Sequence, residues 1–259
     1  MCIFGSNFFH TLKRVLESML EATEIGFITF QTDRDHPILF RAMDALHVTQ
    51  HSTLVRKEAF ESVRIPSETS VHFEIRKLQS YVWKCKKSKR LKLSIDSTST
   101  LFVHELQSQD PPVRIRNVID STPYLPFNES PGDASFTMSS SELAVILLDM
   151  TVGGSTAKVT VRPESEVVLE SMYEAGSNKY VIPRHILNSC ECMEFELTSG
   201  PFIVKFFKLM YTIAQICLDV LVKVWKSFIV IEMQATDNSI HYQQMIRYYV
   251  GPRGVPINS

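Results

Sequence analysis

Residues 107–133 read QSQDPPVRIRNVIDSTPYLPFNESPGD, and this stretch divides the chain of 259 residues into two parts. It holds five prolines and shows neither the period of a helix nor the alternation of a strand, which is typical of an extended linker. Its apolar side chains need a surface to lie on: Val118, Ile119, Tyr124, Leu125 and Phe127. We therefore expect a connector that is anchored along its length to the rest of the protein.

The same succession of elements is predicted on each side of this linker. Apolar residues recur at helical spacing in residues 8–20 and 74–84 before it, and in residues 139–150 and 204–214 after it. The third of these helices begins at Ser139, and Glu142 follows three residues later, which is the spacing of a capping box. Strands are expected at residues 26–31, 38–43, 53–65, 91–95 and 100–106, and again at 158–161, 167–172, 179–182, 193–197, 218–224, 228–233 and 245–250.

The order helix, strands, helix, strands thus occurs twice. Two helices against many strands in each half predict an α+β fold, with the helices covering one face of an antiparallel sheet. We expect two similar domains at residues 1–115 and 134–253, a connector at 116–133 and a tail at 254–259.

Composition narrows the possible classes of function. The chain is 44% hydrophobic and 21% charged, which is typical of a sequence that folds. Its net charge is −1, so binding to a polyanion would require a local patch of basic residues. The longest uncharged piece of its most apolar stretch, residues 209–218, is half of what a bilayer needs, and the start lacks the basic region of a leader. Five cysteines without a C-x-x-C pair favour a reducing compartment.

Five segments, in order along the chain, resemble the eukaryotic-type DNA sliding clamps, the family of proliferating cell nuclear antigen. They are residues 12–17 (LKRVLE), 42–48 (AMDALHV), 60–85 ending in Lys84-Cys85, Ile119-Asp120 followed by Leu125-Pro126-Phe127, and 247–253 (RYYVGPR). The resemblance covers nearly the whole chain. It implies a homotrimeric ring in which helices line a hole around duplex DNA and subunits join by strand pairing, here near residues 98–105 and 178–182.

The family has no catalytic chemistry, so the resemblance implies neither an enzyme nor a cofactor or metal. It implies a processivity factor in the nucleus that tethers DNA polymerase, ligase and nuclease through short peptide motifs. An ATP-driven clamp loader would place the ring on DNA, and no membrane is involved. Two alternatives stay open: a subunit of a heterotrimeric DNA-damage checkpoint clamp with the same fold, and an intracellular hydrolase that uses His47 or the pair Cys190 and Cys192.

A clamp attracts phosphates through lysines and arginines on its helices without reading bases. The candidates here are Lys13, Arg14, Arg76, Lys77, Lys84, Lys205 and Lys208, of which Lys13, Arg14 and Lys205 match basic positions of the family. Each of them also suits an ordinary solvated helix face. Residues 84–90 (KCKKSKR) could serve DNA binding, act as a nuclear localisation patch, or form a basic turn.

The third helix departs from the family. Where the clamps carry basic residues, this chain has Val145, Leu148 and Val152. Either the alignment slips here, or the protein depends on its other helices for DNA contact.

The resemblance also implies a pocket for partner peptides, with a hydrophobic centre and a polar rim. The matching positions are Met43, His47, Val48, Leu125, Phe127, Tyr249, Val250, Gly251 and Pro252. Phe127 replaces a smaller residue, which narrows the expected pocket. The other interpretation of Leu125 and Phe127 is that they simply anchor the connector to the sheet.

Overall fold

The computed structural model describes residues 1–5, 8–85, 90–96, 98–106, 109–118, 124–126, 130–152, 154–173 and 175–247. The chain divides into two compact units. The first comprises Met1–Ala45, Gln50–Leu125 and Gln234–Tyr242, and the second comprises Leu46–Thr49, Pro126–Met233 and the described residues from 243 onward. The expected boundaries at residues 116 and 133 stay a prediction.

The elements before the connector alternate short strands with two helices. They are β1 (Cys2–Phe4), α1 (Phe8–Ala22), β2 (Ile25–Phe30), β3 (Ile38–Met43), β4 (Thr49–Val55), the 3-10 turn η1 (Lys57–Ala59), β5 (Phe60–Val63), β6 (Thr69–Glu74), α2 (Ile75–Lys84), β7 (Leu91–Ile95), β8 (Leu101–Glu105) and β9 (Val113–Ile115).

The elements that follow repeat this order. They are β10 (Ala134–Ser139), α3 (Ser140–Met150), β11 (Thr156–Arg162), β12 (Glu166–Tyr173), β13 (Gly176–Pro183), η2 (Arg184–Ile186), β14 (Ser189–Cys192), β15 (Leu197–Ile203), η3 (Val204–Leu209), α4 (Met210–Ala214), β16 (Cys217–Val224), β17 (Phe228–Ala235) and β18 (Ile240–Arg247).

The strand neighbours show that the repeat extends to topology. In the first half they run β5-β1-β7-β8-β9 and β4-β3-β2-β6; in the second they run β14-β10-β16-β17-β18 and β13-β12-β11-β15. Each strand of the first half therefore has a counterpart whose label is nine higher, in the same place. The printed registers within these runs are antiparallel, as in β2 with β3 and β11 with β12. The predicted α+β fold of two similar parts is confirmed.

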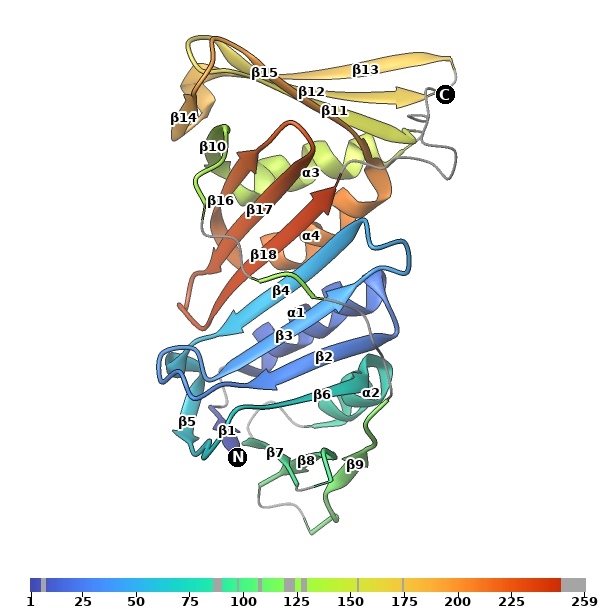
Figure 1. Ribbon diagram of the computed structural model, residues 1–259, viewed down its shortest axis with the longest axis vertical. Coiled ribbons are helices and arrows are strands. Elements are labelled where there is room, and N and C mark those ends of the chain that lie inside the picture. Colours follow the sequence, from blue (N-terminus) through green and yellow to red (C-terminus); the bar gives the residue numbers. More distant parts are fainter. Residues whose placement is uncertain are drawn as a thin grey trace. The chain divides into compact units, whose positions relative to one another are not determined.

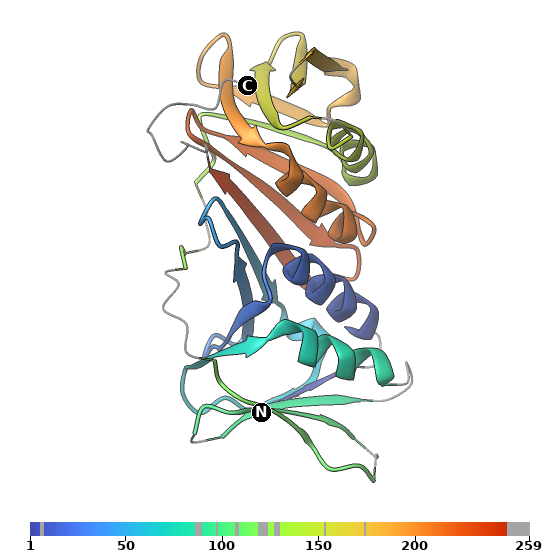
Figure 2. The ribbon, with the colours of Figure 1, turned by 90° about the vertical axis from the view of Figure 1, so that its right-hand side faces the viewer.

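Helix α1 is amphipathic, and its buried side places Leu12, Leu16 and Met19 in the core of the first unit. It packs beside α2, and both helices lie on the same side of their sheet (Figure 2). Gly26 of β2 allows this close packing, because a Cβ there would lie 2.8 Å from Met19 Cε and 2.9 Å from Ile75 Cγ1. In the second unit, α3 packs beside η3 and α4.

Several local predictions are wrong. The strand expected at residues 193–197 is a turn between β14 and β15, and Phe195 in it is 83% exposed. The capping box does not form, because the Ser139 hydroxyl bonds Ser141 Oγ at 2.9 Å and makes no backbone cap. The alternation of residues 53–65 spans β4, η1 and β5, and the last strand begins earlier than expected, at Ile240.

Candidate nucleic-acid interface

Two contacts, one at each end, hold α1 and α2 antiparallel. At one end the Lys13 ammonium lies over the Trp83 ring, 5.1 Å from its centroid. At the other end Arg76 Nη2 lies 3.7 Å from Glu24 Oε1, just beyond the end of α1. Both contacts lie on the exposed side of the helix pair, because the core side is taken by residues such as Leu78. The helix pair is therefore a surface built from two distant parts of the sequence.

Five of the seven predicted DNA-binding cations lie on this helix pair: Lys13, Arg14, Arg76, Lys77 and Lys84. They differ in what they contact.

Three of the five cations have acidic partners. Arg14 Nη1 lies 3.0 Å from Glu17 Oε2, and Lys77 Nζ lies 2.6 Å from Glu74 Oε1, while Arg76 takes Glu24. The pairs of Lys77 and Arg76 are exposed, and such pairs contribute about 0–1 kcal/mol each, so a phosphate can replace the carboxylate at small cost. The pair of Arg14 is half-buried. Lys13 and Lys84 have no acidic partner within the described part of the chain.

The remaining two cations lie in the second unit, on η3. Lys205 and Lys208 are both exposed, and the Lys205 ammonium lies 4.8 Å from the centroid of the Phe206 ring. Because residues 204–209 form a 3-10 helix, Lys205 and Lys208, three apart, align on one face. Tyr211, in α4, is also exposed, whereas the neighbouring Thr212 is buried.

Helix α3 presents no cation at all. Its exposed positions are Ser141, Glu142, Val145 and Asp149, and Val145 is 64% exposed. Val152, just after the helix, is 77% exposed, and Leu148 is half-buried. The exposed side of α3 is therefore apolar and acidic, whereas a helix that binds phosphates would be basic.

The connector is anchored to the first unit by two residues. The Gln50 side chain pairs with the backbone of Leu125: Nε2 donates to the carbonyl oxygen at 2.9 Å, and Oε1 accepts from the amide at 2.7 Å. Tyr124 stacks on Phe27 of β2, with ring centroids 5.0 Å apart. These contacts show that residues 124 and 125 at least serve as anchors.

The predicted peptide pocket stays a prediction. Among its described members, Met43 and Val48 are buried and Leu125 is half-buried, while His47 is exposed in a left-handed conformation with φ 57°. Its other members lie outside the described residues: Phe127, Tyr249, Val250, Gly251 and Pro252.

The free sheet edges differ from those expected for subunit joining. β8, at the expected position 98–105, pairs with β7 on one side and β9 on the other, so it has no free edge. The edge strand next to β8 is β9, a short strand within the proline-rich stretch, and β5 forms the opposite edge of that sheet. The second expectation agrees with the topology, because β13 is an edge strand (Figure 1).

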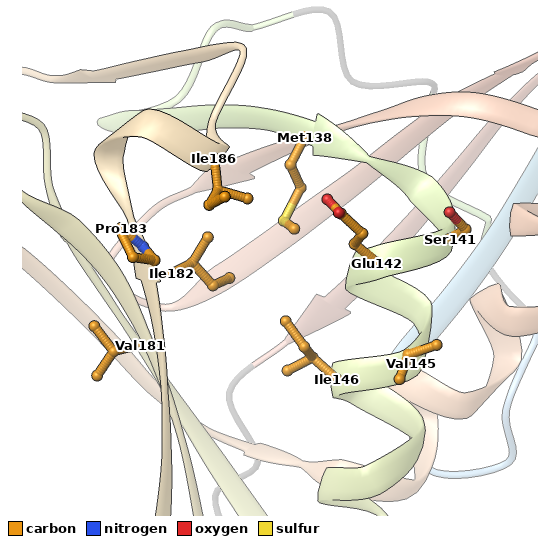
Figure 3. A pocket seen from close by; sticks show the side chains of 9 residues that line it. All are labelled: Met138, Ser141, Glu142, Val145, Ile146, Val181, Ile182, Pro183 and Ile186. Carbon is orange, nitrogen blue, oxygen red and sulfur yellow. The ribbon is translucent and has the colours of Figure 1, made fainter.

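An apolar groove of about 470 Å³ lies beside β13. Figure 3 shows α3 forming one wall and β13 with η2 forming the other, with Ile146 and Ile182 facing the space between them. Val145, Val181 and Ile186 at this groove are exposed. The full lining is Met138, Ser141, Glu142, Val145, Ile146, Val181, Ile182, Pro183 and Ile186.

The described residues hold no group of three His, Cys, Asp or Glu side chains that could bind a metal ion. The histidine nearest to His47 along the chain, His51, is fully buried, with Nδ1 2.9 Å from the Tyr242 hydroxyl and 3.1 Å from the Ser18 hydroxyl. Among the helices described, none is long and apolar enough to cross a membrane.

Comparison with solved structures identifies the architecture. The chain has the DNA-clamp fold. A PCNA2–PCNA3 complex from Sulfolobus tokodaii matches with a TM-score of 0.78 at 12% identity, over 95% of this chain and 98% of that one. PCNA from Entamoeba histolytica matches with a TM-score of 0.76 at 18% identity, over 95% and 99%. A. fulgidus PCNA bound to the C-terminal region of FEN-1 matches with a TM-score of 0.75 at 14% identity, over 96% of this chain and 98% of that one.

Neither a family model nor a curated protein sequence matches this chain. At identities of 12–18%, the structural likeness establishes the fold. The clamp fold explains why the two halves share one topology despite their dissimilar sequences.

Two exposed aromatic residues, Trp83 on α2 and Tyr211 on α4, lie outside the sites predicted from the sequence. For Trp83 a signal exists, because a tryptophan three residues after Ser80 and seven after Arg76 shares their helix face.

Proposed function

We propose that the chain is a subunit of a trimeric DNA sliding clamp. It would encircle duplex DNA without catalysis and act as a processivity factor that keeps DNA polymerase on its template. The observation that carries this proposal is the duplicated topology, in which β9 and β13 are both edge strands of their sheets. A chain with two different free edges can join head to tail, and a rotation that closes gives a ring.

The groove beside β13 supports this mode of joining. Exposed sheet edges and exposed apolar side chains are liabilities in a monomer, and a neighbouring subunit would cover both at once. In the proposed ring, β9 of one copy extends the sheet at β13 of the next, and apolar side chains of the copy that supplies β9 cover Val145, Val181 and Ile186 of the other.

The cations on α1, α2 and η3 support duplex binding. Lysines and arginines on helices hold phosphates without reading bases, which is what a sliding protein needs. The seven predicted residues keep this proposed role, with Lys13, Lys84, Lys205 and Lys208 contributing most, because their charges are not shared with an acid among the described residues.

The proposed partners follow from the clamp role. DNA polymerase, ligase and nuclease would dock through short peptides, and a clamp loader would open the ring. The A. fulgidus PCNA structure holds the C-terminal region of FEN-1, which supports peptide docking on this fold. The proposed location is the nucleus, with residues 84–90 as the candidate localisation patch.

A second candidate is a subunit of a heteromeric ring, such as a DNA-damage checkpoint clamp. The observation in its favour is α3, whose exposed face carries Glu142 and Asp149 and no cation. The Sulfolobus match is a complex of two different PCNA chains, so the fold is compatible with such rings.

Light scattering on the purified full chain separates the two candidates. A species of three times the 29.6 kDa chain mass, stable on dilution, is expected for a self-sufficient ring. A monomer at all concentrations would overturn the homotrimer and favour the heteromeric ring.

A further inference from the structure

We propose that Trp83 and its two flanking lysines form a binding site for unpaired nucleotides. The inference rests on the proposed function in one respect: a clamp carries DNA past its helices. It goes beyond that function, because encircling a duplex requires no contact with bases.

The first observation is the exposure of the indole. Trp83 is 40% exposed on α2, on the stripe that holds Arg76 and Ser80. Burying a tryptophan in the core stabilises a fold, so a ring left this open at the surface offers an apolar face that a ligand can cover.

The second observation is the charge around the ring. Lys13 from α1 lies over the indole, with Nζ 5.1 Å from the centroid, and Lys84 follows Trp83 directly in the chain. These two lysines are the cations of the helix pair that have no acidic partner among the described residues, whereas Arg14, Arg76 and Lys77 are paired. Of the two cations without an acidic partner, one therefore lies over the indole and the other follows it in the last turn of α2.

The chemistry of this arrangement favours single strands. An exposed aromatic ring on a positively charged surface is the arrangement by which proteins bind single-stranded nucleic acid: the ring stacks on a base and nearby cations hold the adjoining phosphates. In a duplex the base faces are already stacked on one another, so the indole can gain little from it. The sequence adds charge of the right sign, since residues 76–92 hold eight basic residues and no acid.

Fluorescence tests the proposal directly, because the sequence has only two tryptophans. Trp225→Phe leaves Trp83 as the sole indole; Trp225 stacks on Phe228, and a phenylalanine keeps a ring there. Titration of this full-length variant with a 12-nucleotide oligothymidylate should quench the fluorescence saturably. A 12-base-pair duplex at the same salt should quench it less. No quenching by the oligothymidylate would overturn the proposal.

Binding of labelled oligonucleotides to the otherwise unchanged chain supplies the second readout. Trp83→Leu should weaken oligothymidylate binding about five-fold or more and duplex binding less than two-fold, and Trp83→Phe should retain part of the affinity. Phe195→Leu is the matched control, since it removes an exposed ring that lies between Glu194 and Glu196, and it should change neither affinity. If Trp83→Leu weakened the binding of oligothymidylate and of duplex equally, the effect would be general and would contradict the proposal.

The two proposals can fail separately. A 12-nucleotide oligomer needs no ring, so oligothymidylate quenching in a chain that never closes on DNA would refute the sliding clamp and leave this site standing. Retention on closed circular DNA without any quenching of Trp83 fluorescence would support the sliding clamp and refute the nucleotide site.

Discussion

The side-chain amide of Gln50 pairs with both backbone groups of Leu125, at 2.9 and 2.7 Å. A buried glutamine on β4 thereby gives the connector the two hydrogen bonds that a neighbouring strand would give it.

Replacing Gln50 with leucine should release the connector at this point. We expect the Leu125 amide to lose its protection in hydrogen exchange and the free energy of unfolding to fall by about 1–2 kcal/mol, since the two bonds to Leu125 and a third to the Ser52 hydroxyl are lost. Gln234→Leu is the control, because it removes an exposed glutamine bond to Asn238 instead. Unchanged exchange at Leu125 in the Gln50 variant would refute the anchoring role.

Burial lowers the pKa of His51 from 6.5 to about 3, where the ring faces the hydroxyls of Ser18 and Tyr242. The folded-state pKa lies below the unfolded one, so the unfolded chain binds the proton first and stability falls as the pH drops from about 6.5 toward 3. We expect this group alone to reduce the free energy of unfolding by about 2 kcal/mol between pH 7.5 and pH 5.

Urea denaturation at a series of pH values measures this effect. His51→Gln should flatten the dependence on pH between 5 and 7, even if it lowers stability overall. His10→Gln, at an exposed position on α1, serves as the control and should leave the slope unchanged. A His51→Gln variant with the slope of the unchanged chain would contradict the assignment.

Charge reversal at Lys13 and Arg14 should weaken DNA binding without disturbing assembly. The change Lys13→Glu with Arg14→Glu removes two phosphate contacts, so the slope of log K against log salt should decrease by about 2. The matched control reverses Lys57 and Arg64, which are exposed outside α1 and α2 in the same unit. Unaltered polymerase stimulation by the Lys13 and Arg14 variant would remove these residues from the DNA-contacting surface.

The groove beside β13 should control the mass of the assembly. Val181→Asp combined with Ile186→Asp places two charges on side chains that are already exposed, so the monomer should fold while association is lost. Leu218→Asp alters a more exposed apolar side chain away from the groove and should leave the mass unchanged. Assembly that survives the double change would exclude this groove as the joining surface.

The sequence predicts most of the helices because their apolar residues keep a helical period, as Leu12, Leu16 and Met19 do in α1. It predicts the second half as a repeat of the first from the order of elements alone. What it misses depends on contacts between distant residues or on local geometry without periodicity. β9 has three residues and follows two prolines, and residues 204–209 form the 3-10 helix η3 where the apolar period predicts the start of an α-helix.

The candidate site shows the same division. The cations are visible in the sequence because a helix period places them on polar faces. Which of them are free is not visible, since the partner of Arg76 is Glu24, fifty-two positions earlier in the chain. The Lys13 contact with Trp83 spans an even longer separation, and no local pattern indicates it.

Encirclement of DNA is the central claim, and retention on circular DNA tests it most directly. The full chain is loaded onto a nicked circular plasmid, and the bound protein is measured before and after a single cut linearises the circle. The account predicts retention on the circle at a salt concentration that abolishes simple phosphate binding, and loss of the protein once free ends exist. Equal retention on circular and linear DNA would show binding by affinity alone and would contradict the account.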